Sequence, residues 1–250
     1  VVVVMSMVLS CEGGGGAIEI GLAMPETHVE RWQRDGAALL EGAQGLGYAA
    51  EVTYGDADQG LQNEQIQNFI TKGAKVLIVG NINEGVNSVV SEAAEEEISV
   101  IAYDRLITGS DDYDYYITFD NFKVGEFQGQ AIVDALELDS VSADDPKQIT
   151  LFAGSPTDNN ANFFFDGAMS RLRPYIEDGV LEVVGPAPMS SADSAFTRIA
   201  TENWRAEVAK ARMENLLSNA ALNVTLDAVL APNDTLARAI IEALGADAKY

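Results

Sequence analysis

The sequence predicts an α/β protein whose strands form parallel sheets covered by helices. Strand-like and helix-like patterns alternate along the chain from residue 17 onward. Some short strand patterns, such as Val76–Val79, are apolar at every position, as expected for parallel strands that are buried on both faces. With 250 residues, of which 47% are hydrophobic, the chain is long enough to build a large core or two smaller ones.

A first lobe is predicted over residues 17–119. Its helices show apolar residues three or four positions apart, and the first two stop at a glycine. The expected strands are residues 17–24, 51–54, 76–79, 100–103 and 115–119. The expected helices cover about residues 29–43, residues 59–71, and a segment carrying Val86, Val89, Val90 and Ala93. This order implies a right-handed, doubly wound sheet.

A second lobe is predicted over residues 120–250. Its expected helices are residues 124–136, a segment ending near 173, about 203–217, and 234–244; its expected strands are 149–153, 180–184 and 228–231. The two lobes are expected to join near residues 119–122. The acidic loop at residues 139–145 lacks the alternating oxygen ligands and central glycine of a calcium loop, so we interpret it as a solvated turn. The fold expected is therefore two Rossmann-like lobes.

The amino terminus is expected to lie outside this fold. Residues 1–10 are uncharged and mostly apolar, too short to span a bilayer but similar to the hydrophobic part of a secretory signal. Val8-Leu9-Ser10-Cys11 resembles a bacterial lipobox, which predicts a lipid-modified Cys11 and a tether of four glycines up to residue 16. Leu9 is not the usual residue there, and the missing basic region suggests that the true start precedes Val1. A plain strand with a buried cysteine is the alternative.

Composition excludes several classes of function. The chain has 15 basic and 39 acidic residues, a net charge of −24, which repels nucleic acid and anionic membranes. One cysteine permits neither an intrachain disulfide nor a cysteine metal cluster, and the one histidine, His28, is a poor basis for a catalytic relay. Gly42, Gly45 and Gly47 end a helix and do not fit a dinucleotide motif. We expect no catalytic residues, metal or cofactor.

Polar side chains recur where the predicted strands end. In open α/β sheets, ligands bind at the carboxyl ends of the strands. Carboxylates, amides and guanidinium groups bond hydroxyls, and aromatic rings cover C–H faces, so together they suit a sugar. The candidates found at strand ends are Arg31, Trp32, Asp104, Arg105, Asp158, Asn159, Asn160, Asn233 and Asp234.

Each candidate taken alone has a structural alternative. Asp104 and Arg105 could form a surface ion pair, Asn233 or Asp234 could cap the following helix, and Trp32 could belong to the core. Their shared position at strand ends is what favours a binding cleft between two facing lobes.

Five motifs resemble those of the periplasmic sugar-binding proteins of the xylose-, glucose- and galactose-binding group, which are substrate receptors of ABC importers. The resemblance runs from about residue 18 to 244. The motifs are Glu30-Arg-Trp-Gln33, residues 100–107, residues 119–121 with 124–125, residues 154–156 with 158–161, and Arg212-Met-Glu-Asn-Leu216. The resemblance implies a type I periplasmic binding protein fold, with hinge closure of two lobes on a monosaccharide.

The resemblance also implies roles for individual residues. Arg31, Arg105, Asn160 and Asn233 match positions that bond sugar hydroxyls, with Asp158 and Asn159 adjacent. Trp32 matches an aromatic that covers one sugar face. Trp204, nine residues before Met213, matches the other stacking tryptophan, and this assignment rests on the resemblance alone.

The implied protein is a monomeric, extracytoplasmic receptor, periplasmic or lipid-anchored on the outer face of the cytoplasmic membrane. It delivers sugar to ABC permease subunits, touches the membrane only through a lipid anchor, binds no nucleic acid and catalyses nothing. The family continues beyond the position of Tyr250 with a further strand, an aspartate and a basic residue, so we expect an incomplete chain. Residues 186–200 also depart from the short linker of the family.

Other functions remain open at this point. The effector domain of a transcription regulator shares the fold but should carry a basic helix-turn-helix ahead of Ile18, where the sequence has an apolar run. An enzyme acting on sugars or nucleotides is disfavoured by the missing cofactor motif. A sugar or autoinducer receptor for chemotaxis or sensing differs only in its partner, and the sequence does not separate it from a transport protein. It does not identify the sugar either.

Overall fold

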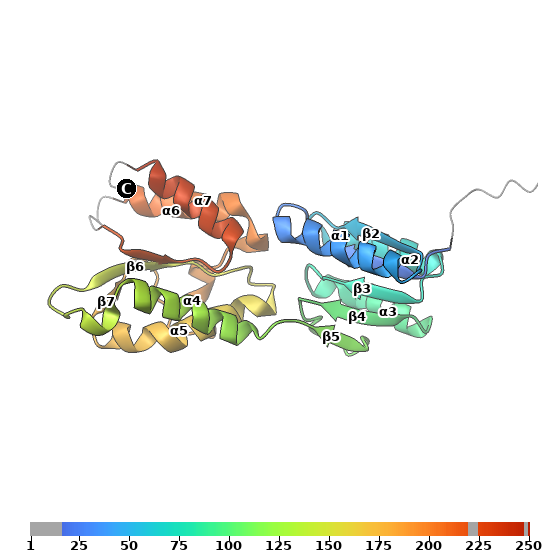
Figure 1. Ribbon diagram of the computed structural model, residues 1–250, viewed down its shortest axis with the longest axis horizontal. Coiled ribbons are helices and arrows are strands. Elements are labelled where there is room, and N and C mark those ends of the chain that lie inside the picture. The colour runs from blue at the N-terminus through green and yellow to red at the C-terminus, as the bar shows by residue number, and fades with distance from the viewer. Residues whose placement is uncertain (1–16, 220–224, 248–249) are drawn as a thin grey trace, which may run out of the picture.

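The computed structural model describes residues 17–219, 225–247 and 250. The predicted signal and tether of residues 1–16, with Cys11, lie outside the described residues. Figure 1 shows two α/β lobes side by side, β1–β5 with α1–α3 in one and β6–β8 with α4–α7 in the other. The predicted fold class is thereby confirmed.

The first lobe contains a five-stranded parallel sheet of order β2-β1-β3-β4-β5. Its strands are β1 (Ile20–Met24), β2 (Ala50–Tyr54), β3 (Val76–Val79), β4 (Ser99–Tyr103) and β5 (Tyr115–Ile117). Its helices are α1 (Glu30–Gly45), α2 (Gln59–Thr71) and α3 (Asn87–Glu95), with a short 3-10 turn η1 (Glu84–Val86).

The strand β1 lies inside this sheet, between β2 and β3, and four of its five residues are buried. Leu22 pairs in register with Val52 of β2 and Ile78 of β3. Phe69 of α2 packs against Gly21 so closely that a β-carbon there would collide with its ring. The sheet order places the carboxyl ends of β1, β3 and β4 together at one edge, which faces the other lobe (Figure 1).

The second lobe contains a three-stranded parallel sheet of order β7-β6-β8. Its strands are β6 (Lys147–Leu151), β7 (Leu181–Val183) and β8 (Ala228–Leu230). Its helices are α4 (Asn121–Ala135), α5 (Asn159–Glu177), α6 (Ala206–Ser218) and α7 (Asp234–Gly245), with the 3-10 turns η2 (Leu138–Ser140), η3 (Phe196–Arg198) and η4 (Glu202–Trp204). Helices α4 and α5 cover one side of this sheet, and α6 and α7 cover the other (Figure 1).

Several element boundaries differ from the sequence prediction by a few residues, and the starts of two helices, each about three residues from the predicted position, have a local reason. Helix α6 begins at Ala206 rather than near residue 203, because Asn203 and Trp204 have left-handed φ angles of 49° and 54°. Helix α4 begins at Asn121 rather than 124, because the Asp120 carboxylate caps it by accepting from the Lys123 backbone N–H at 2.9 Å.

Helices α4 and α5 approach each other through glycines. A β-carbon on Gly125 would lie 2.1 Å from the carbonyl oxygen of Phe164, and one on Gly167 would lie 2.1 Å from the carbonyl oxygen of Phe122. Backbone atoms cannot rotate away as a side chain does, so the two helices would have to separate. The contact between α4 and α5 fixes the start of α4, and α4 directly follows the segment that leads from the first lobe into the second.

We expect Gly125→Ala to destabilise the fold by about 3 kcal/mol or more, at the upper end of overpacking effects. Gly42→Ala is the matched control, since Gly42 lies in α1 with no atom near its absent β-carbon, and it should stabilise the helix by up to about 1 kcal/mol. Denaturant unfolding of both variants measures the two effects. Equal stabilities for the two variants would contradict the role assigned to Gly125.

Candidate ligand-binding cleft

A cavity of about 120 Å³ lies between the lobes, where the carboxyl ends of strands from both sheets face each other. Both lobes contribute to its wall. The lining residues are Val29, Arg31, Trp32, Asp104, Arg105, Asp158, Asn160, Phe164, Trp204, Pro232 and Asn233. The wall thus combines two tryptophans with guanidinium, carboxylate and amide groups.

Arg31 and Trp32 come from the first turn of α1 and form one side of the cavity. Both terminal nitrogens of Arg31 donate to Asp104 Oδ1 at 3.0 Å, and Nη2 also donates to Asp35 Oδ2 at 2.8 Å. The guanidinium carbon lies 4.5 Å from the centroid of the Trp32 ring, in the range of a cation–π contact. Trp32 is buried, so the arginine is held between a ring face and two carboxylates.

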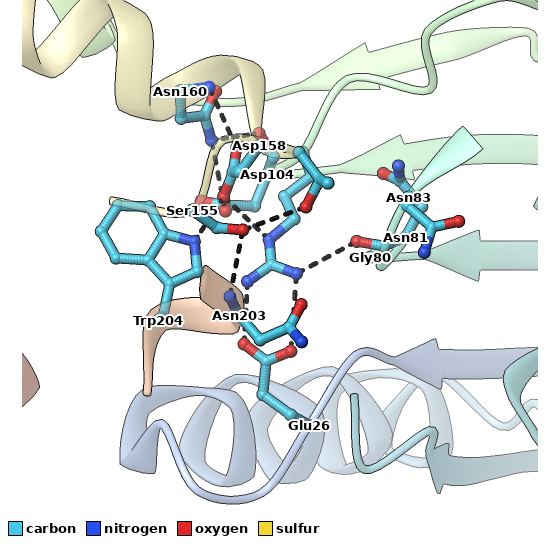
Figure 2. Close-up of polar contacts among 12 residues, drawn as sticks. Glu26, Gly80, Asn81, Asn83, Asp104, Ser155, Asp158, Asn160, Asn203 and Trp204 are labelled. Carbon is cyan, nitrogen blue, oxygen red and sulfur yellow. Dashed lines mark hydrogen bonds and ion pairs between the residues drawn. The ribbon is translucent and has the colours of Figure 1, made fainter. Parts of the chain in front are cut away.

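Arg105 follows β4 and is the most enclosed cation of the site, with 5% of its surface exposed. Its Nη2 donates to Glu26 Oε1 at 2.8 Å, and its Nη1 donates to the Asn81 carbonyl oxygen at 3.2 Å (Figure 2). Its Nε lies 3.0 Å from Asp158 Oδ2 in the other lobe, an ion pair in which the N–H is not aligned for a hydrogen bond. Arg105 is therefore fixed by both lobes.

Asp158 organises the wall of the second lobe. It caps α5, with Oδ1 accepting from the Asn160 backbone N–H at 3.0 Å, while Oδ2 accepts from the Trp204 indole Nε1 at 3.0 Å (Figure 2). Trp204 lies directly against Gly154, where a β-carbon would overlap its ring, and it meets Phe164 edge to face. Gly154, three residues after the end of β6, thus makes room for the tryptophan.

Asn160 connects the second lobe to the first through the nitrogen of its amide. Its Nδ2 donates to the Asp104 carbonyl oxygen at 3.0 Å, and its Oδ1 accepts from Asn121 Nδ2 at 2.8 Å. Asn121 lies at the start of α4, directly after the segment that crosses between the lobes. Asp104 has a left-handed φ of 64°, and its carbonyl oxygen also accepts from Thr118 Oγ1 at 2.9 Å.

Asn233 completes the second wall and also caps a helix. Its Oδ1 accepts from the Leu236 backbone N–H at 2.9 Å at the start of α7, which leaves the Nδ2 group for a ligand. The capping alternative and the binding alternative are therefore compatible at this residue.

Burial and charge act against each other at this site. Burial raises the pKa of Asp104, and the nearby Asp158 raises it further, while Arg31 lowers it. Burial lowers the pKa of Arg105, but Asp158 and Glu26 outweigh it, so its pKa lies above the ordinary value and the group stays charged. The same balance, with Asp104 and Asp35 as partners, raises the pKa of Arg31. Arg31 and Arg105 are therefore charged hydrogen-bond donors that carboxylates hold in place.

The structure brings most of the predicted residues together. Arg31, Trp32, Asp104, Arg105, Asp158, Asn160, Trp204 and Asn233 line the cavity, whereas Asn159 and Asp234 do not. Asn159 is the half-buried first residue of α5, and Asp234 is the exposed first residue of α7. At a helix start, neighbouring side chains point in different directions, so each neighbours a lining residue without sharing its orientation.

The ion-pair alternative for Asp104 and Arg105 is wrong. Both side chains are buried, and they pair with other partners: Asp104 with Arg31, and Arg105 with Glu26 and Asp158. Trp32 belongs to the core and lines the cavity at once.

The sequence analysis missed several residues of the site. Val29, Phe164 and Pro232 also line the cavity, and Glu26 lies behind Arg105. Phe164 lies in a run of three phenylalanines shortly after Asp158, and this run is a signal by which it could have been found. Nothing in the spacing around Glu26 distinguishes it from the other acidic residues.

Other hollows lack this chemistry. One of about 350 Å³ lies between β8, α7 and Tyr250 and is mostly apolar, with Asp227 as its charged residue. Another, of about 670 Å³, lies on the acidic surface of residues 106–113 and is open to solvent. Among the described residues, no group of three or more His, Cys, Asp or Glu is placed to hold a metal ion. Across those same ranges, every helix is too short or too polar to cross a bilayer.

Comparisons with known proteins agree with this geometry. The multiple sugar-binding periplasmic receptor ChvE of Rhizobium radiobacter is 44% identical over 226 residues, which cover 90% of this chain and 62% of the receptor. The D-xylose-binding periplasmic protein of Escherichia coli is 38% identical over 230 residues, covering 92% of this chain and 63% of that protein. This chain thus spans less than two thirds of the length of these relatives.

A solved structure of an ABC transporter solute-binding protein from Clostridium phytofermentans, with bound β-D-glucose, superposes with a TM-score of 0.83. It is 40% identical, and the match covers 91% of this chain and 68% of that one. A carbohydrate transporter solute-binding protein from Chloroflexus aurantiacus, in complex with D-glucose, gives 0.81 at 32% identity, covering 92% and 69%. A family model described as a periplasmic binding protein domain matches residues 20–250, and the chain belongs to that family.

Proposed function

We propose that this protein is the extracytoplasmic substrate-binding component of an ABC sugar importer and that it holds one monosaccharide between its lobes. The observation that carries the proposal is the cavity itself, in which Trp32 and Trp204 stand among Arg31, Arg105 and Asn233. Two relatives, 44% and 38% identical to this chain, are named for sugar binding, and two similar solved structures hold glucose.

The lining matches the surface of a pyranose. A pyranose has hydroxyls around its rim, which donate and accept, and C–H groups on its faces, which are apolar. Guanidinium and amide N–H groups donate to the rim hydroxyls, Asp104 Oδ2 accepts from them, and the tryptophans cover the faces. A wall of this kind rejects an analogue that lacks one hydroxyl, because a buried polar group of the protein is then left unpaired.

The lobes close on the ligand by moving about the segment between β5 and α4. In the structure they already touch at the rim of the cleft, where Arg238 Nη1 lies 3.5 Å from Glu30 Oε2 and His28 Nε2 lies 2.9 Å from the Asn203 carbonyl oxygen. The volume of the cavity, about 120 Å³, is below the range of roughly 300–1,000 Å³ that is usual for small-molecule sites. Hinge opening therefore accompanies sugar entry.

The remaining parts of the proposal concern location and partners. The protein acts as a monomer on the outer side of the cytoplasmic membrane, delivers sugar to permease subunits and performs no chemistry on it. Lipid attachment at Cys11 would keep it near the permease. Two relatives are named as periplasmic proteins, and this supports the location.

Calorimetric titration of the protein expressed from its whole gene tests the proposal. D-xylose, D-glucose, D-galactose and L-arabinose are the ligands, and mannitol, an open-chain polyol without a ring face, is the control. We expect saturable heat with at least one of the four aldoses and none with mannitol. No heat with any monosaccharide would refute the proposal.

A further inference from the structure

Glu26 is the strongest candidate for a functional residue outside the cavity wall. It follows β1, has 1% of its surface exposed and does not line the cavity. We propose that Glu26 is a positioning residue that fixes the Arg105 guanidinium and so determines how strictly one sugar hydroxyl is selected. This inference rests on the proposed function.

The contacts hold the guanidinium on three sides. Glu26 Oε1 and Oε2 lie 2.8 and 3.5 Å from Nη2 and Nη1 of Arg105. The Asn81 carbonyl oxygen accepts from Nη1, and Asp158 faces Nε. A guanidinium has five N–H donors, and among the described residues Nη2 has Glu26 as its hydrogen-bond partner. The second hydrogen of Nη2 is the donor that these contacts leave for a ligand.

The two carboxylates that pair with Arg105 differ in where they come from. Asp158 belongs to the second lobe and moves away when the cleft opens, whereas Glu26 and Asn81 belong to the same lobe as Arg105. Glu26 is therefore the anionic partner that stays with Arg105 in the open form. It keeps the guanidinium oriented before a sugar arrives, which lowers the entropy that binding must remove.

A fixed donor selects more strictly than a mobile one. A guanidinium held in place can bond only a hydroxyl at the matching position, and it is left unpaired when that hydroxyl is missing. Without Glu26 the same group can turn toward the Asn81 carbonyl oxygen or toward water, so the missing hydroxyl costs less. Glu26 thus acts on selectivity through Arg105, without touching the sugar.

The test compares the aldose that binds best among the four with its monodeoxy analogues, each of which lacks a single hydroxyl. For every analogue, calorimetry gives the ratio of its Kd to that of the parent aldose, in the wild type and in Arg105→Lys, Glu26→Gln and Glu26→Ala. Arg105→Lys keeps the positive charge but lacks the planar, forked N–H donors of a guanidinium. The hydroxyl that Arg105 bonds is identified as the one whose deoxy analogue shows a Kd ratio lowered by about fivefold or more in this variant. Glu26→Gln should lower the ratio at that same hydroxyl by about threefold or more and leave the others within about twofold.

Glu51→Gln is the matched control, since Glu51 pairs with Lys72 in the same lobe away from the cleft, and its ratios should equal those of the wild type. Thermal melting of each variant accompanies the titrations, and the isosteric Glu26→Gln keeps the test valid where Glu26→Ala does not fold. A ratio that Glu26→Gln leaves unchanged, or an equal change in every ratio, overturns the inference. If the wild type binds any of the four aldoses, either result leaves the proposed function intact; if it binds none of them, the proposed function and this inference both fall.

Discussion

Replacing Arg105 with alanine is expected to weaken sugar binding by at least about tenfold, on the scale of a lost charge-assisted hydrogen bond. It is also expected to destabilise the protein by about 3–5 kcal/mol, because removal of one partner leaves buried charges uncompensated. The stranded groups are the carboxylates of Glu26 and Asp158, which are almost fully buried and face Arg105 from opposite lobes. This is the largest single effect that we expect in the protein.

Calorimetry with the aldose that binds best, and denaturant unfolding, measure the two parts of this prediction. Arg34→Ala is the control, since its side chain is 71% exposed and its contact with Glu30 is long, at 3.9 Å. Changes at exposed positions usually lie within about 0.5 kcal/mol. Unchanged sugar affinity in Arg105→Ala would show that the sugar does not bind in this cavity.

Trp204→Ala is expected to have the second largest effect. The side chain is 4% exposed and packs against Gly154 and Phe164, so its loss should cost about 3–5 kcal/mol of stability. It should also weaken sugar binding by at least about tenfold, because a ring face and the indole bond to Asp158 are lost together.

Trp204→Phe separates these two contributions. Phenylalanine keeps an aromatic face but has no N–H, so Asp158 loses one donor while the sugar keeps a ring to stack on. We expect affinity between those of the wild type and Trp204→Ala, measured by calorimetry with the same aldose. If Trp204→Ala binds as tightly as the wild type, Trp204 is a core residue only.

The order and type of the elements could be predicted because each leaves a local pattern. Val76–Val79 is apolar at every position, which predicts a strand that is covered on both faces. The following helix, α3, has apolar residues three or four positions apart, which predicts a helix that is buried on one face. The start of α6 could not be predicted in the same way. Asn203 and Trp204 adopt left-handed φ angles without a glycine, and tertiary contacts of Trp204 with Asp158 and Gly154 stabilise them.

The candidate site could be predicted in part, because the topology brings strand ends to one edge whatever the side chains are. This argument places Asp104, Arg105 and Asn160 correctly in the cleft. It does not fix the direction of a side chain, so Asn159 was predicted together with Asn160 although it lies outside the lining. Glu26 could not be found, because its role depends on a residue 79 positions away along the chain.

The amide of Asn160 has a consequence for the timing of binding. Separation of the lobes breaks its bond to the Asp104 carbonyl and the Arg105–Asp158 pair in one movement. In the proposed receptor, a sugar enters and leaves only when both have opened, because these two contacts join the lobes across the cavity. They therefore act on the rates of capture and of release together.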